Sequence, residues 1–440
     1  MRGIYSNKTE IRHKVFTEIA RMAYEDYPLS HIEDLPFEII PGEIGKYYDN
    51  IFLERARATL GLPVRNMSEH APLSDGIDAS AIDEKYYDPP LINIIKFACH
   101  ACPEKRVLIT NGCQGCIEHP CIEVCPKNAI HMENGRSVID QEKCIKCGKC
   151  VNACPYNAII KQERPCAAAC GMNAIKSDEY GRADIDYDQC VSCGMCLVSC
   201  PFSAIVDKSQ IFQTVLALKS DTPIYAAIAP SFVKQFGDKV TPEQVRAALK
   251  AVGFEDMVEV AIGADLCAVQ EAADFMKEVP NEHPWLGTSC CPAWSVMAKK
   301  TYPEYADCIS MALTPMVLTG RMTKKQHPDC KVVFIGPCAA KKLEASRKSV
   351  RSDIDFVLTF EEMMGIFDAK NIEFDKLEVE EPLNTSSSLG KGFAASGGVA
   401  AAVVNAINCL EPEREVKTVK AEGLKECKTM LAKAKAGMYD

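Results

Sequence analysis

Closely spaced cysteines constrain the fold of this chain more than any other feature of its sequence. Residues 144–155 and 190–201 each read C-x2-C-x2-C-x3-C-P, and residues 113–126 read C-x2-C-x4-C-x3-C-P. Spacing this short lets three thiolates of one loop reach three irons of a cubane, while the fourth cysteine ligates the neighbouring cluster. A zinc ribbon is the alternative, but a zinc site does not need the trailing Cys-Pro three times over. The motifs therefore predict tandem ferredoxin-like units.

A partial repeat between the last two motifs predicts a fourth set. Cys166 and Cys170 precede an Asn-Ala-Ile segment that echoes the Asn-Ala-Ile or Ser-Ala-Ile after each complete motif. Cys99 and Cys102 would supply the missing pair, with ordinary thiols at these two positions as the alternative. Cross-ligation groups the sixteen cysteines as Cys113, Cys116, Cys121 and Cys154; Cys144, Cys147, Cys150 and Cys125; Cys190, Cys193, Cys196 and Cys170; and Cys99, Cys102, Cys166 and Cys200. Other pairings of the four motifs remain open.

The rest of the composition bears on the compartment and the partners. The chain has 24 cysteines, but its first residues carry no apolar stretch of the kind found in a secretory signal. No apolar run is long enough to cross a bilayer, and the net charge of -10 argues against a surface that binds nucleic acid. We therefore expect a cytoplasmic protein whose cysteines are thiolate ligands, with neither a membrane nor a nucleic acid as partner.

The chain divides into three regions that differ in composition and in the pattern of apolar residues. Residues 1–90 are polar and mostly helical, with the clearest helix at 10–27, and we expect a structural or partner-docking extension. Residues 91–208 form the ferredoxin-like 4Fe-4S domains. Residues 209–440 alternate apolar runs with amphipathic helices, which favours parallel α/β layers and a multidomain fold of α+β and α/β parts. Strands are predicted at 224–229, 258–262, 332–335 and 356–359.

Two short segments of the third region carry the chemistry. Residues 288–294 read TSCCPAW, and residues 336–344 read GPCAAKKLE directly after a predicted buried strand. Adjacent cysteines do not form a disulfide with each other easily. We therefore expect one of the pair to bind a ligand and the other to have a different role. A strand that ends by presenting a cysteine and then a lysine predicts a site at the carboxyl edge of a sheet.

These segments resemble the first two signature motifs, TSCCPxW and PCxxKxxE, of the iron-only (FeFe) hydrogenases of the multi-cluster, ferredoxin-containing type. The resemblance implies a two-lobed α/β large domain. It also implies an H-cluster, a four-iron cubane joined through a cysteine sulfur to a di-iron unit with carbon monoxide, cyanide and azadithiolate ligands. Cys291 and Cys338 match cubane ligands, Cys290 matches the thiol that passes protons, and Lys341 matches the lysine that meets a cyanide.

A second set of residues resembles the proton relay of the family. Glu344 and the segment 263–274 fall in that region, and Glu271 and Asp274 are spaced three apart, so they share a helix face. Asp274 stands where the family commonly has glutamate, and Gln270 cannot titrate. A solvated helix face is the alternative interpretation of these carboxylates.

Two departures from the family pattern affect the expected activity. Gly336 stands where many relatives carry methionine, which predicts a less filled pocket wall. The third motif, of the form CxxGC, is not found in the 440 residues, and Cys409 and Cys427 are predicted to be core or surface thiols. We expect a C-terminally incomplete large domain, as a fragment or as a natural short form, that lacks two ligands and binds the di-iron unit poorly.

The expected function is reversible oxidation of H2 to protons, fed by three to four 4Fe-4S clusters in the ferredoxin region. The resemblance implies ferredoxin or another redox partner, together with the maturation proteins that build the di-iron unit. An electron-transfer or H2-sensing protein without turnover is the alternative. A third candidate is a hydrogenase-like iron-sulfur assembly factor, against which Cys290, Lys341 and Glu344 argue.

Overall fold

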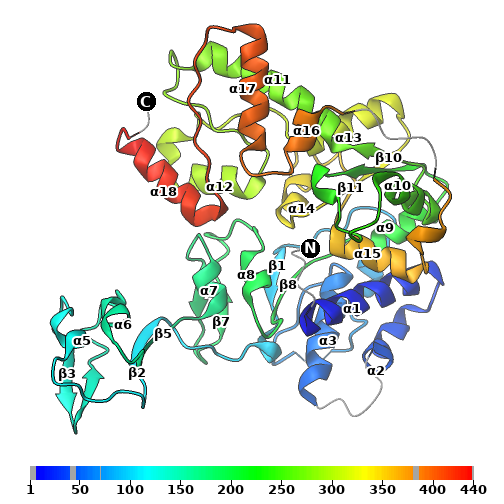
Figure 1. Cartoon of the computed structure of the whole chain (residues 1–440). Helices are drawn as coiled ribbons and strands as arrows, with labels where there is room; N and C mark the ends of the chain where they lie inside the picture. Colours follow the sequence, from blue (N-terminus) through cyan, green and yellow to red (C-terminus); the bar gives the residue numbers. More distant parts are fainter. Residues whose placement is uncertain (1–5, 40–45, 70, 380–385, 439–440) are drawn as a thin grey trace.

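The structure, a computed structural model, describes residues 6–39, 46–69, 71–379 and 386–438. It contains an N-terminal helical segment, two small β/α units and a large α/β unit (Figure 1). The predicted fold class of ferredoxin-like units followed by an α/β large domain is confirmed. None of the helices in the described ranges is both long and apolar enough to span a bilayer.

The N-terminal helices share a hydrophobic core with the large unit. Helix α1 (Asn7–Tyr24) begins three residues earlier than predicted, where the backbone N–H of Ser6 donates to Thr9 Oγ1 at 2.9 Å. It packs on α15 (Phe360–Ala369) and α9 (Ile211–Leu218), and buries Val15 and Ile19 in the same core as the sheet. The shorter elements are η1 (Leu29–Glu33), α2 (Leu35–Ile39), α3 (Lys46–Thr59) and α4 (Ile77–Ser80).

The cysteine-rich region forms two units of short antiparallel strand pairs. The distal unit contains β2 (Arg106–Ile109) paired with β5 (Ile159–Gln162), β3 (Ile130–Glu133) paired with β4 (Arg136–Ile139), and helices α5 (Pro120–Glu123) and α6 (Lys149–Ala153). The proximal unit contains β1 (Ile92–Ile94) paired with β8 (Ile205–Asp207), β6 (Ile175–Ser177) paired with β7 (Ala183–Ile185), η2 (Lys96–Ala98), α7 (Pro165–Ala169) and α8 (Met195–Ser199). The distal unit projects away from the rest of the molecule (Figure 1, cyan).

A parallel sheet with strand order β10-β9-β11-β12 organises the large unit. Its strands are β9 (Ile224–Ile228), β10 (Asp256–Glu259), β11 (Lys331–Gly336) and β12 (Phe356–Thr359). The remaining elements are η3 (Pro230–Phe232), α10 (Pro242–Ala251), α11 (Val260–Glu278), α12 (Pro292–Thr301), η4 (Pro303–Tyr305), α13 (Pro315–Gln326), α14 (Ala340–Ala345), η5 (Phe374–Lys376), α16 (Ser388–Gly392), α17 (Gly398–Leu410) and α18 (Gly423–Lys435). Parallel strands bring their carboxyl ends to one edge, and the segment that carries Cys338 leaves β11 there.

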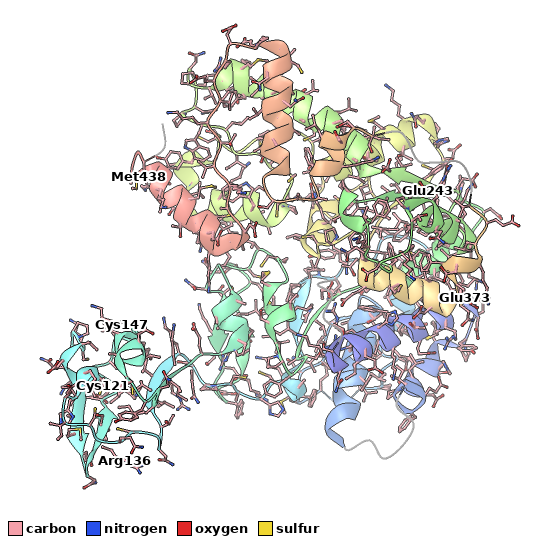
Figure 2. The ribbon with its side chains drawn as sticks, viewed as in Figure 1. Cys121, Arg136, Cys147, Glu243, Glu373 and Met438 are labelled. Carbon is pink, nitrogen blue, oxygen red and sulfur yellow. The ribbon has the colours of Figure 1, made fainter. Side chains whose placement is uncertain are left out.

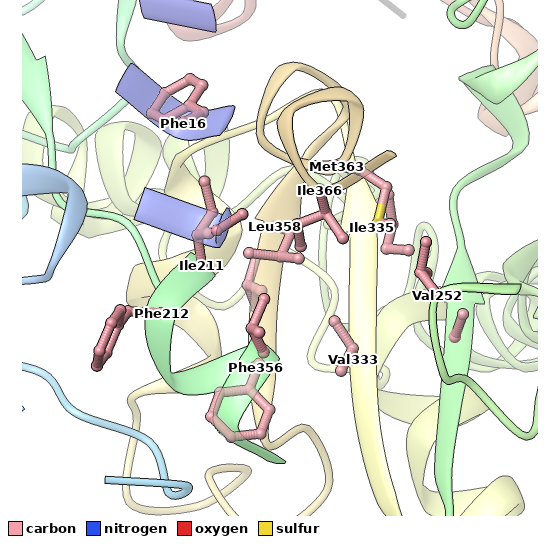
Figure 3. Packing of buried hydrophobic residues seen from close by; sticks show 14 of the residues in the cluster. Phe16, Ile211, Phe212, Val252, Val333, Ile335, Phe356, Leu358, Met363 and Ile366 are labelled. Carbon is pink, nitrogen blue, oxygen red and sulfur yellow. The ribbon is translucent and has the colours of Figure 1, made fainter. Parts of the chain in front are cut away.

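Side chains from separate parts of the chain meet in the main core. Figure 3 shows Phe16 of α1, Ile211 of α9 and Ile366 of α15 around Phe356, Leu358, Val333 and Ile335 of the two adjacent strands. Helix α1 is polar on average, but its apolar residues recur with the period of a helix and so lie on one face. That face joins the core.

One predicted strand is partly wrong. The sequence pattern predicts a strand at 258–262, whereas β10 ends at Glu259 and α11 begins at Val260. A short apolar run is compatible with a buried strand and with a buried helix, and periodicity alone does not separate them. The consequence is functional, because the residues that follow in α11 become one continuous helix that reaches Glu271.

Candidate functional site

Two cysteine sets line separate cavities in the distal unit. Cys113, Cys116, Cys121 and Cys154 line one hollow of about 320 Å³, and Cys125, Cys144, Cys147 and Cys150 line another of about 320 Å³. Figure 2 labels Cys121 and Cys147 within this unit. In each hollow the fourth cysteine comes from the other motif, which is the arrangement that cross-ligation predicts.

A third cavity, in the proximal unit, is lined by cysteines from the beginning and from the end of that unit. Cys99, Cys102, Cys166 and Cys200 line a hollow of about 330 Å³ together with Arg164. The buried Arg164 guanidinium donates to the carbonyl oxygens of Cys102, Lys176 and Gly181, and so ties the loop of Cys102 to the rest of the unit. Cys99 and Cys102 therefore lie with a complete set rather than apart from the other cysteines.

The backbone supports the inclusion of Cys99 and Cys102 as a ligand loop. In each of the four sets, the third residue of the first C-x2-C loop has a positive φ: 47° at Ala101, 58° at Gly115, 58° at Lys146 and 53° at Ser192. Residues with a side chain seldom adopt this left-handed conformation, so its repetition marks one shared loop geometry. The same holds for the Asn-Ala-Ile and Ser-Ala-Ile repeats, whose first residues have φ between 50° and 55° at Asn128, Asn157, Asn173 and Ser203.

The fourth set lies closest to the two signature segments. Burial raises the pKa of Cys193, and the neighbouring charges of Cys170, Cys190 and Cys291 raise it further. Backbone N–H groups donate to the sulfurs, from Ala174 to Cys170 and from Ser192 to Cys190, at 3.3 and 3.4 Å. A Cβ placed on Gly194 would lie 3.9 Å from the Cβ of Ala339, so this loop touches the residue after Cys338.

Cys291 and Cys338 come from different elements and approach each other in this region. Cys291 is the N-cap residue of α12, and its loop is fixed by the Trp294 indole, which donates to the Thr288 carbonyl at 2.9 Å. Cys338 is half-buried between β11 and α14. Burial raises the pKa of Cys338 to about 11, and the charge of Cys291 contributes to that rise. The two cysteines thus lie within electrostatic range of each other.

A buried ion pair lies beside these cysteines. Lys341 Nζ is 2.7 Å from Glu344 Oε2, and both residues are buried. The Thr314 hydroxyl donates to Glu344 Oε1 at 2.7 Å. Burial raises the pKa of Cys290 to about 12, while the Lys341 charge opposes that rise. A buried cation requires a fixed anionic partner, and Glu344 fills that role here.

Glu271 on α11 reaches the same region from the other side. It is 1% exposed, and its Oε1 accepts the backbone N–H of Ser289 at 3.2 Å, while Oε2 has no hydrogen-bond partner among the described residues. Burial raises the pKa of Glu271 from its ordinary value of 4.5, although the nearby Ser310 hydroxyl and the Ser289 N–H partly oppose it. The charge of Glu271 also contributes to the raised pKa of Cys290.

This burial gives a prediction about stability and pH. Folding raises the pKa of Glu271, so the folded state prefers the protonated carboxyl. The free energy of unfolding therefore falls as pH rises from about 4.5, the ordinary pKa, through the higher pKa of the folded state. We expect Glu271→Gln to gain melting temperature relative to the wild type over that window, as measured by thermal unfolding at several pH values. Exposed Glu282→Gln is the control. A difference between Glu271→Gln and wild type that does not change with pH would contradict this account.

The sequence of this chain is similar to those of several known proteins. The sequence family described as the iron-only hydrogenase large subunit, C-terminal domain, matches residues 222–440. Iron hydrogenase 1 of Clostridium pasteurianum is 32% identical over 322 residues, which are 67% of this chain and 55% of that protein. The periplasmic [Fe] hydrogenase large subunit of Nitratidesulfovibrio vulgaris is 31% identical over 314 residues, 66% of this chain and 73% of that protein. The chain belongs to the iron-only hydrogenase family.

Further matches cover the cysteine-rich region and widen the range of relatives. A 4Fe-4S binding domain matches residues 137–160, and the LdpA Fe-S cluster-binding domain matches residues 160–211, which confirms the prediction of 4Fe-4S clusters there. The cytosolic Fe-S cluster assembly factor NAR1 of Kluyveromyces lactis is 27% identical over 177 residues, 38% of each chain. The chain described here, a member of the iron-only hydrogenase family, is therefore a hydrogenase-like iron-sulfur protein. It spans about half, 55%, of the length of the Clostridium protein.

Two sequence expectations differ from the geometry of this hydrogenase-like site. Asp274 does not join Glu271 on the inner face, because its carboxylate accepts from the Gln270 side chain at 2.8 Å on an exposed face. The wall at Gly336 is not open, because a Cβ there would meet the Phe334 ring at 2.5 and 2.7 Å. Cys409 and Cys427 agree with the prediction of core or surface thiols, because Cys427 packs in the cluster that includes Cys338 and Cys409 is exposed.

Sequence reasoning missed two polar residues of the site. Ser310 is buried beside Glu271 and also lines a hollow of about 1520 Å³ with Cys267, Gln270 and Asp274. Thr314 precedes α13 and binds Glu344. Thr314-Pro315 reads as a helix start, and Ser310 interrupts an apolar run, but neither signal indicates which carboxylate the hydroxyl contacts.

Proposed function

We propose that this chain is a hydrogenase-like oxidoreductase that interconverts H2 with two protons and two electrons. The observation that supports it most is the meeting of Cys290, Cys291, Cys338 and the Lys341–Glu344 ion pair next to the loop of Cys193. Hydrogen chemistry needs a metal centre, a path for electrons and a path for protons. The sulfur-lined cavities, the paired central cysteines and the Glu271 region correspond to these three needs.

The donor sets fit iron-sulfur groups. Four cysteine sulfurs around each hollow would hold one cubane, and backbone N–H groups aimed at the sulfurs would stabilise the thiolates. Cys291 and Cys338 would hold the cubane of the active centre as two of its ligands. When bound, the complete H-cluster, with its di-iron unit, supplies the redox metal at which H2 is split.

The residues around the central cysteines would handle protons and charge. Cys290 would exchange a proton with the bound centre, and Glu271 would receive it, because its raised pKa keeps the two groups closer in proton affinity than an exposed glutamate would be. Ser310 would connect Glu271 with the hollow that opens to solvent. Lys341, held in place by Glu344, would offer its ammonium group to an anionic ligand of the bound centre.

Hydrogen evolution tests this function. The 440-residue chain, and the same chain extended with a CxxGC segment typical of the family, would be matured anaerobically with hydrogenase maturation proteins and assayed with reduced methyl viologen. We expect turnover by the extended chain, and a loss of at least about a hundredfold in its Glu271→Gln variant but not in Glu282→Gln. An extended chain with loaded clusters but no turnover would exclude the hydrogenase function.

Two other functions remain as candidates. An electron-transfer or H2-sensing protein would keep the three cavities lined by cysteine sets and give no turnover in the assay above. The similarity to NAR1 favours, as a further candidate, a role in iron-sulfur cluster assembly. The match of Cys290, Lys341 and Glu344 to the hydrogenase signature segments argues against that role. A cytoplasmic location and association with maturation proteins stay predictions.

A further inference from the structure

The N-terminal helical segment packs against one of the cysteine-lined cavities. Helix α3 contacts η2 and β8, and Figure 1 shows α3 next to β8. These two elements flank the hollow of Cys99, Cys102, Cys166 and Cys200. Ala58 of α3 is buried in the same hydrophobic cluster as Cys166 and Cys200. The segment, expected from its sequence to be a structural or partner-docking extension, therefore forms part of the surroundings of a cluster site.

Arg55 of α3 brings a buried positive charge to this cavity. It is 3% exposed, and its guanidinium donates to the carbonyl oxygen of Ser203 and, at 3.0 Å, to the Ser203 hydroxyl. Ser203 lies in the turn that follows Cys200. Burial and the charge of Arg12 lower the pKa of Arg55 to about 9, while the charge of Cys200 opposes that fall. The guanidinium is therefore protonated at neutral pH and lies within electrostatic range of the Cys200 sulfur.

The carboxylates near Arg55 are paired with other cations. The charges of Asp207 and Glu361 also oppose the fall of the Arg55 pKa. However, Asp207 lies 2.9 Å from the Lys342 ammonium, and Glu361 lies 2.7 Å from the Arg12 guanidinium. The hydrogen bonds of Arg55 itself go to Ser203, and its Nε has no hydrogen-bond partner among the described residues. Its positive charge is thus held against the turn after Cys200.

A second cation of the N-terminal segment reaches the same turn. Lys8 of α1 is half-buried, and its Nζ donates to the carbonyl oxygens of Val198 and, at 3.3 Å, of Cys200. The distal hollows differ: Lys127 and Lys149, which line one of them, are exposed, and no Lys or Arg of the described residues lines the other. A buried charge acts over a lower dielectric than an exposed one. The cavity of the proximal unit is therefore under the stronger positive influence.

Resting on the proposed four-iron cluster in this cavity, we propose that the N-terminal helical segment raises the midpoint potential of that cluster through the charges of Arg55 and Lys8. Reduction adds one electron to the cluster, whose four thiolate ligands are already anionic, and makes it more negative by one charge. Coulomb attraction to a fixed cation grows with that negative charge, so the two cations stabilise the reduced state more than the oxidised state. The segment thus sets the driving force for electron transfer at this step of the relay.

A potentiometric titration followed by EPR tests this proposal. The full chain with reconstituted clusters is titrated without oxygen at neutral pH, and the step of this cluster is the one that Cys99→Ser/Cys102→Ser removes. We expect Arg55→Gln to lower the equilibrium constant for one-electron reduction at this step by about tenfold, which is about 59 mV. Lys8→Met is expected to lower it by about threefold, because water partly screens a half-buried charge. The other steps should not move.

Arg57→Gln is the matched control. Arg57 is a buried arginine of the same helix, but its guanidinium donates to the carbonyl oxygens of Pro63, Leu73 and Asp75. Arg55→Lys keeps the positive charge. We expect both variants to leave the step where it lies in the wild type, because neither changes the charge beside Cys200.

Three results would overturn the proposal. The first is a step that moves in neither Arg55→Gln nor Lys8→Met. The second is an equal shift in Arg57→Gln, because the packing of the segment would then matter rather than the charge. The third is a titration in which Cys99→Ser/Cys102→Ser removes no step, because the cavity would then hold no cluster. If Arg55→Gln fails to retain its iron, the shift or constancy of the step in Lys8→Met decides. None of these readouts requires hydrogen turnover, so a failure of the hydrogenase function would be seen separately.

Discussion

The double variant Cys125→Ser/Cys147→Ser is expected to lose one four-iron cluster, about four irons per chain, whereas Cys125→Ser/Cys116→Ser loses two, about eight irons. Cys125 and Cys147 line the same hollow, so the second substitution removes a ligand of a cluster that is already lost. Cys116 lines the other hollow, so its loss affects a different cluster. The measurements are iron and sulfide analysis, together with EPR spin counts of the reduced protein.

The same experiment distinguishes cross-ligation from ligation within each motif. If each motif held its own cluster, Cys125 would share a cluster with Cys116 and not with Cys147, and the two double variants would exchange their results. Cys409→Ser is the control, because Cys409 is exposed on α17 and lies in none of the four sets. It is expected to keep the full iron content.

Lys342→Met is expected to destabilise the large unit by about 3–5 kcal/mol. Lys342 is 2% exposed, and its Nζ lies 2.7 Å from Glu362 Oε1 and 2.9 Å from Asp207 Oδ2. Burial lowers the pKa of Lys342, but the two carboxylates outweigh it and hold the pKa above its ordinary value. Removing the ammonium leaves two buried negative charges facing each other. The effect reaches across domains, because Asp207 ends β8 and Glu362 caps α15.

Denaturant unfolding followed by tryptophan fluorescence measures this loss, because both tryptophans, Trp285 and Trp294, lie in the large unit. Lys348→Met, at an exposed position, is the control. The double variant Lys342→Met/Glu362→Gln should regain part of the lost stability, since Asp207 keeps Arg12 as a cation at 3.9 Å. A Lys342→Met chain as stable as the Lys348→Met chain would contradict the buried network.

The sequence predicted what depends on spacing and periodicity. The cysteine sets follow from short loops with fixed ligand separations, and three of the four groupings line separate hollows in the structure. The strands at β9, β11 and β12 follow from apolar runs bounded by turns. The boundary between β10 and α11 did not follow, because a run such as Val258–Ile262 is buried equally well in either conformation.

Long-range partners were the part that the sequence did not predict. Glu344, whose role in the proton relay stays a prediction, accepts a hydrogen bond from Thr314, which is 30 residues away in the sequence. The adjacent Lys342, which shows no motif of its own, became the centre of a buried charge network. Both outcomes depend on which helix faces which strand, and no local pattern carries that information.

The central claim is that cysteines from separate motifs converge on shared cavities and hold iron there. Anomalous diffraction at the iron absorption edge, from crystals of the chain grown without oxygen, tests it most directly. The account predicts iron peaks in the hollow shared by Cys125 and Cys147, in that shared by Cys116 and Cys154, and in that shared by Cys99 and Cys200. Hollows without iron, or a peak ligated by the four cysteines of a single motif, would contradict it.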